Sequence, residues 1–99
     1  METKMLFGVG LVFETPEFGI IVMGANEELD ELLPSTIKEM IGEQIIIKKT
    51  DGEEQIFEVT STQIKHSIVG KKNIGICLGK GISPDEVPAG SIVYCYPLG

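Results

Sequence analysis

Apolar and polar residues alternate with a period of two over most of the chain, a pattern that predicts β-strands rather than helices. In the first strand, over residues 5–13, one face would carry Met5, Phe7, Val9, Leu11 and Phe13. Thr15-Pro16 ends this run, and a second apolar run follows at 18–23. So short a connection favours an antiparallel hairpin, in which Gly8 and Gly10 indicate a bulge, strong coiling of the strand or a close approach of two backbones.

A second hairpin is predicted around Asp51-Gly52, because this dipeptide lies between the apolar segments 44–49 and 54–59. With a two-residue turn, the expected opposite pairs are Ile47 with Ile56, Ile46 with Phe57, and Lys49 with Glu54. Three further strands are expected at 62–69, 73–78 and 91–96.

Two short helical turns are predicted between the strands. Over residues 35–41, Thr36 and Glu39 have the spacing of a capping box, and Gly42 is placed to end the helix. The segment Ser83-Pro84-Asp85-Glu86 predicts a single capped turn, with a cap residue, a proline at the first helical position and an acid two residues later.

About seven short strands with one or two helical turns and no long helix indicate the all-β class. A length of 99 residues is enough for one core, so residues 1–99 are expected to form a single domain. Within this class we expect a small closed antiparallel β-barrel of about six to seven strands, because closure leaves no sheet edge exposed.

Three segments carry a resemblance to a known family. They are Gly42-Glu43-Gln44-Ile45-Ile46-Ile47, Asn73-Ile74-Gly75-Ile76-Cys77-Leu78 and Gly81-Ile82-Ser83-Pro84-Asp85-Glu86-Val87-Pro88-Ala89-Gly90-Ser91-Ile92-Val93. Together they resemble domain 2 of the elongation factor Tu family of translational GTPases. In that family a Gly-Asp or Gly-Glu turn opens a strand, an Asn-Val-Gly strand crosses the barrel, and an Ile-x-x-x-Asp/Glu-Ile-x-x-Gly-x-Val segment leads into the closing strand.

The resemblance implies a β-barrel of the translation-factor domain 2 type, here without the GTPase domain that carries the chemistry of those factors. A stand-alone domain of this kind is expected to be a non-catalytic binding or adaptor module. Its expected partner is a protein or a translation component.

Charge narrows the choice of partner. The sequence has 15 acidic and 8 basic residues, for a net charge of -7, and every basic residue is a lysine. Because the chain lacks the guanidinium fork that grips phosphate and guanine, DNA binding is not expected and a protein with a basic face is favoured. An alternative hypothesis is weak RNA binding through a patch of lysines. The simpler interpretation is that these lysines lie at strand ends and only keep the protein in solution. The patch would comprise Lys65, Lys71 and Lys72, with Lys48 and Lys49.

Residues 25–41 form an acidic insertion or a helical turn, whose acidic members are Glu27, Glu28, Asp30 and Glu31. These carboxylates are candidates for a cation site or for an acidic docking surface, and the simpler interpretation is a solvated loop. Calcium loops alternate their oxygen ligands around a central glycine and end in a bidentate glutamate, a pattern that this segment lacks. No metal site is therefore predicted.

Candidate catalytic side chains are few. His66 is the only histidine, and alternation with Ile64 places its ring on the apolar side of its strand, as a hydrogen-bonded histidine of the core or its rim. Cys77 and Cys95 lie in strand segments, where free cysteine commonly acts as a small buried apolar residue. We therefore predict no catalytic residue and no cofactor. One alternative is a small-molecule-binding protein or thiol-based small enzyme that uses Cys77, Cys95 or His66 in the barrel mouth.

The chain shows no signal-peptide pattern and no apolar run of about 18 residues, so a membrane partner is not expected. The two cysteines are widely spaced and provide no disulfide framework. These features predict a cytoplasmic protein, and they leave its oligomeric state open.

Overall fold

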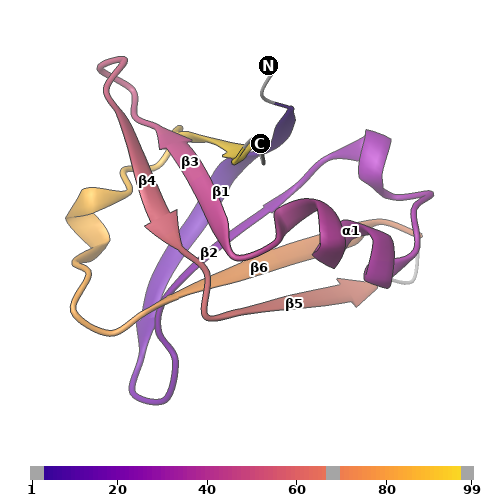
Figure 1. The fold of residues 1–99 in the computed structure, drawn as a ribbon, viewed down its shortest axis with the longest axis horizontal. Coiled ribbons are helices and arrows are strands. Elements are labelled where there is room, and N and C mark those ends of the chain that lie inside the picture. The colour runs from indigo at the N-terminus through magenta and orange to yellow at the C-terminus, as the bar shows by residue number, and fades with distance from the viewer. Residues whose placement is uncertain (1–3, 67–69, 97–99) are drawn as a thin grey trace.

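Seven antiparallel strands make up one sheet in the computed structural model, which describes residues 4–66 and 70–96 (Figure 1). The strands are β1 Met5–Thr15, β2 Gly19–Ala25, β3 Gln44–Lys48, β4 Glu54–Glu58, β5 Ser61–His66, β6 Lys72–Gly79 and β7 Ile92–Cys95. The helical segments are η1 Glu27–Leu29, α1 Pro34–Ile41 and η2 Pro84–Glu86. The strands pair in the order β4-β3-β7-β1-β2-β6-β5. The predicted all-β class is confirmed.

The expected closed barrel is not confirmed, because the strand order ends at β4 and β5 without a ladder between them. Residues 59 and 60 lead directly from β4 into β5. At this corner the N–H and the hydroxyl of Thr60 both donate hydrogen bonds to the Cys77 carbonyl of β6, at 2.8 and 3.1 Å. The chain therefore passes from one end of the strand order, at β4 and β3, to the other end, at β6 and β5. We call the strands near these two ends the two halves of the curled sheet.

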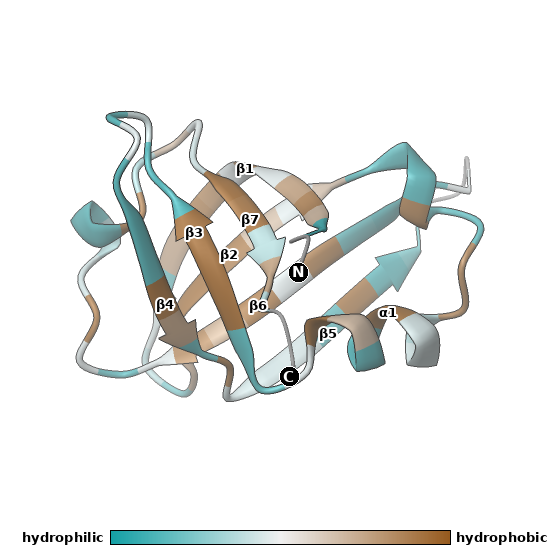
Figure 2. Ribbon diagram, turned by 45° about the horizontal axis from the view of Figure 1, so that its top comes forward, coloured by the Kyte–Doolittle hydropathy of each residue, from teal (hydrophilic) through white to brown (hydrophobic). Residues whose placement is uncertain are grey.

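The buried apolar side chains form one cluster enclosed by the curled sheet, and Figure 2 shows apolar residues on strands of both halves. Ile45 and Ile47 enter the cluster from β3, and Ile74 and Ile76 enter it from β6. α1 adds Ile37 and Ile41, one turn apart on the same helix face. Burial of these side chains is the main force that holds the two halves together.

β1 departs from regular alternation at two bulges. Leu6 is an extra residue in the ladder with β7, and Gly10 is an extra residue in the ladder with β2. Because a bulge changes which side chains face inward, Leu6 and Phe7 are both buried, whereas Leu11 is 56% exposed. The expected bulge is confirmed, but the single apolar face predicted from Met5 to Phe13 is wrong.

The second hairpin forms one residue out of the predicted register. The N–H of Gly52 donates to the Lys49 carbonyl at 2.9 Å, and Gly52 has a φ of 92°. These features close a three-residue loop, and Ile46 lies opposite Ile56 rather than opposite Phe57. A shift of one residue exchanges the two faces of a strand, so the predicted pairing is wrong.

The helical segments match the predictions in position and differ in one cap. α1 begins at Pro34, follows Leu33 without a side-chain cap, and ends at Ile41, before the cap residue Gly42, whose φ is 63°. The expected capping box of Thr36 and Glu39 does not form, because both residues lie inside the helix. The box at η2 is present, with the N–H of Ser83 donating to the Glu86 carboxylate at 2.7 Å.

The strands predicted at 73–78 and 91–96 correspond to β6 and β7. The strand predicted at 62–69 corresponds to β5, which ends at His66, and its last three positions lie outside the described residues. Within the described ranges, no helix has the length and apolar character needed to cross a membrane.

Candidate functional site

Lys72 and Asp30, predicted as members of two separate sites, are in contact. Lys72 begins β6 and is only 6% exposed. Its backbone N–H donates to the Asp30 carboxylate at 2.9 Å, and its ammonium donates to the Asp30 backbone carbonyl. Lys72 therefore holds the acidic segment against the sheet, and its side chain is not part of an exposed cationic patch.

The rest of the acidic segment turns away from this contact. Glu27, Glu28 and Glu31 are exposed, whereas Leu29 between them is buried in the core. Asn26 fixes the start of the turn, since its side-chain amide donates to the Leu6 carbonyl at 2.9 Å and its amide oxygen accepts from the Glu28 N–H at 3.0 Å. In the described part of the chain, no group of three or more His, Cys, Asp or Glu side chains is arranged to hold a metal ion.

The predicted lysine patch is not assembled. Lys65 and Lys71 are exposed at the adjoining ends of β5 and β6. Lys48 and Lys49 lie at the β3–β4 turn, at the end of the hairpin away from the corner at Thr60, and Lys65 lies at the end of β5 away from the same corner. Because Lys72 is buried, Lys65 and Lys71 are the two members of the predicted patch that remain exposed at this end of β5 and β6.

Cys77 and His66, two of the three residues considered for thiol chemistry, are far apart. Cys77 lies opposite Ser61 in the ladder, and five further residues along β5 lead to His66, a distance of about 17 Å at the usual rise of a strand. Cys95 lies opposite Ile45 on β3. Burial raises the pKa of the Cys95 thiol, and the nearby Lys4 offsets this only in part. A thiol with a raised pKa is a poor nucleophile, and no Cys–His pair forms.

His66 shares a face of β5 with half-buried Ile64, but its side chain is exposed, so it is not a core histidine. β5 is an edge strand, and His66 is its last residue. Alternation along the chain places a side chain on one face of a strand. It does not show how far the core extends along that strand.

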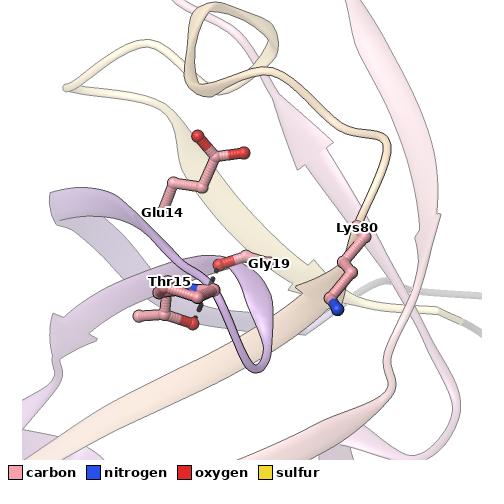
Figure 3. A pocket seen from close by; sticks show the side chains of 5 residues that line it. Glu14, Thr15, Gly19 and Lys80 are labelled. Carbon is pink, nitrogen blue, oxygen red and sulfur yellow. Dashed lines mark hydrogen bonds between the residues drawn. The ribbon is translucent and has the colours of Figure 1, made fainter.

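A hollow of about 420 Å³ lies beside the β1–β2 turn, between Thr15 and Lys80 (Figure 3). The Thr15 hydroxyl donates to the Gly19 carbonyl at 3.3 Å and accepts from the Phe18 N–H at 3.0 Å, so its polar atoms serve the turn. In Figure 3 the Glu14 carboxylate and the Lys80 ammonium point in different directions. The polar groups here do not converge on a common point, as they would in a small-molecule site.

The outer face of the sheet carries an apolar row that crosses four strands. Ile46 of β3 lies directly opposite Ile56 of β4 on one side and opposite Tyr94 of β7 on the other. Tyr94 in turn lies opposite Met5 of β1. Ile56 is 52% exposed, Met5 is 44% exposed, and the two central side chains are half-buried. We call these four residues the outer row.

The outer row faces away from the core because its sequence neighbours face inward. Ile45, Ile47 and Val93 are fully buried, so the side chains between them on β3 and β7 point to the opposite face. Glu54 and Lys48 are opposite each other on one side of the row, and Glu58 and Gln44 on the other. The row thus has the apolar centre and polar margin that are typical of protein interfaces.

Hollows lie on both sides of the outer row. One, of about 350 Å³, is lined by residues that include Lys48, Ile92 and Tyr94. The other, of about 200 Å³, is lined by residues that include Met40, Gln44 and Tyr96. The two hollows are depressions in the surface beside the outer row, large enough to receive side chains of a partner.

Sequence reasoning missed the outer row, although one signal points to it. Ile45-Ile46-Ile47 is apolar on both faces of its strand, as in strands that are covered on both sides. In the described residues only the inner face is covered. The error in hairpin register hid the row, because it set Ile46 opposite Phe57 instead of opposite Ile56.

Comparison with known proteins gave no match: no family model matches the chain, and neither a curated protein nor a solved structure is significantly similar to it.

Proposed function

We propose that this chain is a non-catalytic binding module that docks onto a partner protein through the outer row. The observation that carries the proposal is the alignment of four apolar side chains, Met5, Tyr94, Ile46 and Ile56, at directly opposite positions on the solvent side. Single exposed apolar residues are common on protein surfaces. A contiguous apolar group with a polar margin is instead a mark of an interaction surface.

Charge supports a partner with a basic surface around an apolar centre. The chain carries a net charge of -7, and Glu54 and Glu58 flank the row at its β4 end. Opposite charge on the partner would speed the encounter and set its orientation. The burial of Lys72 and the wide separation of the other lysines weigh against a nucleic-acid backbone as the partner.

The family resemblance extends this proposal to a translation component as the class of partner. We further propose that the curled sheet is an incompletely closed barrel of the translation-factor domain 2 type. The continuous passage from β4 into β5 at Thr60 supports this comparison. A cytoplasmic setting fits two cysteines that are both free thiols.

Site-specific photo-crosslinking in the native cell tests the proposal. A photoreactive residue is placed at position 56 in the outer row and, as a control, at position 33, where Leu33 is 68% exposed outside the row. We expect discrete protein adducts from position 56 that are absent from position 33. Equal adducts from both positions, or none from position 56, would contradict the proposal. The identity of the adducts decides whether the partner belongs to translation.

A further inference from the structure

The free edge of β4 has three backbone positions that point away from the sheet. The Lys49 N–H donates to the Glu53 carbonyl at 2.7 Å, and the Val59 N–H donates to the Glu43 carbonyl at 2.8 Å, so these two bonds bracket the β3–β4 ladder. In an antiparallel ladder, residues that bond the partner strand alternate with residues that bond away from it. The N–H and C=O groups of Glu54, Ile56 and Glu58 therefore point toward the free edge.

Within the described residues, no strand pairs with this edge. β4 stands at one end of the strand order, and Figure 1 shows β3 on one of its sides and no strand on the other. Among residues 4–66 and 70–96, no hydrogen bond from another segment reaches the backbone of Glu54, Ile56 or Glu58. All three side chains are exposed. An unpaired edge of this kind is a template for an additional strand.

β3 displays part of the side-chain pattern that suits β4, with Gln44 in place of a cation opposite Glu58. Across the existing ladder, Lys48 lies opposite Glu54 and Ile46 lies opposite Ile56. A strand on the free edge would meet the same outward side chains of β4. A cationic residue would pair with each glutamate, and an apolar residue between them would continue the outer row by one more strand.

We propose that the free edge of β4 binds an extended segment of the partner protein as an added β-strand, with the pattern Lys/Arg-x-apolar-x-Lys/Arg. This inference rests on the proposed docking function and names the chemistry of the partner segment. Backbone hydrogen bonds hold the segment, and alternate side chains select it. A second copy of the chain is a poor occupant, because antiparallel pairing of two β4 edges about Ile56 sets Glu54 of one copy against Glu58 of the other.

The experiment uses two capped heptapeptides, Thr-Lys-Thr-Ile-Thr-Lys-Thr and its counterpart with glutamate in place of both lysines. Binding is followed by NMR titration of the intact protein at low salt. We expect the lysine peptide to bind and the glutamate peptide to bind at least about tenfold more weakly. Amide hydrogen exchange should slow at Glu54, Ile56 and Glu58 and should stay unchanged on β5, the other edge strand.

Two changes separate strand addition from docking on the outer face. N-methylation of alternate peptide backbone nitrogens removes the hydrogen bonds of one peptide edge and keeps every side chain, so we expect a loss of about tenfold or more in affinity. The double variant Glu54→Lys/Glu58→Lys, whose positions are exposed, should reverse the preference between the two peptides.

The outcomes distinguish this inference from the proposed function. If the lysine peptide binds equally well when N-methylated, or fails to bind while position 56 still forms cross-links in the cell, strand addition is overturned and docking through the outer row stands. If neither cross-links nor peptide binding are found, both are overturned. Binding that depends on the peptide backbone and on both glutamates supports the inference.

Discussion

The ring of Phe7 occupies the space that a Cβ at position 24 would fill. Gly24 lies on β2 beside the bulged part of β1, and the Gly8 carbonyl approaches it from the same strand. Only a residue without a side chain lets these two backbones and the buried ring pack together. The sequence indicated a bulge or a close approach at Gly8 and Gly10, whereas the glycine that the close approach requires is Gly24 of β2.

We expect Gly24→Ala to destabilise the protein by about 1–3 kcal/mol, because the added methyl forces the Phe7 ring or the β1 backbone to move. Gly8→Ala is the matched control, since a Cβ at position 8 has nothing within 4 Å. Urea unfolding of both variants measures the difference. Equal loss in the two variants would show that crowding against Phe7 does not explain the effect.

Asp30→Ala should lower the free energy of unfolding by about 1–3 kcal/mol, because it leaves the backbone N–H of buried Lys72 without its acceptor. Glu31→Ala, at the exposed neighbouring position, should change it by less than about 0.5 kcal/mol. Thermal and urea unfolding provide the measurement. If the two variants behave alike, the contact between Asp30 and Lys72 does not stabilise the fold.

Two neighbouring isoleucines test the register of the second hairpin. Ile47→Ala should cost about 2–5 kcal/mol because Ile47 is fully buried, and Ile46→Ala should cost clearly less because Ile46 lies in the half-buried outer row. Both substitutions remove the same atoms from the same strand, so each is the control for the other. The reverse order would support the two-residue turn.

The raised pKa of Cys95 predicts a pH effect on stability. Above about pH 8.5, the usual thiol pKa, the unfolded chain releases the Cys95 proton while the folded protein still holds it. Loss of the proton stabilises the unfolded state alone. The free energy of unfolding therefore falls as the pH rises from about 8.5 toward the raised pKa of the folded protein. Urea unfolding of wild type and Cys95→Ala at pH 7 and pH 9.5 isolates the contribution.

Between pH 7 and pH 9.5, we expect the free energy of unfolding to fall more in the wild type than in Cys95→Ala, because only the wild type has the Cys95 thiol. A difference that stays constant with pH would show that the thiol has an ordinary pKa. In the folded protein at neutral pH, maleimide should react slowly with Cys95 and should reach buried Cys77 only on unfolding.

Local patterns in the sequence predicted most of the elements. The alternation at 18–23, the turn residues Asp51-Gly52 and the cap at Ser83-Pro84 each act within a few residues, and each element formed close to its expected place. Gly42 and Gly90 likewise have the positive φ that their turns require. These features depend on backbone stereochemistry and on hydrogen bonds between near neighbours, which the sequence alone determines.

The candidate site depended on relationships that no local pattern encodes. One residue of loop length at Gly52 decided whether Ile46 faces the core or the solvent, and the bulges at Leu6 and Gly10 decided the same for β1. Lys72 and Asp30 came together across 42 positions. Alternation determines that a strand has two faces, but burial, which involves the whole molecule, decides which face is covered and which edge stays open.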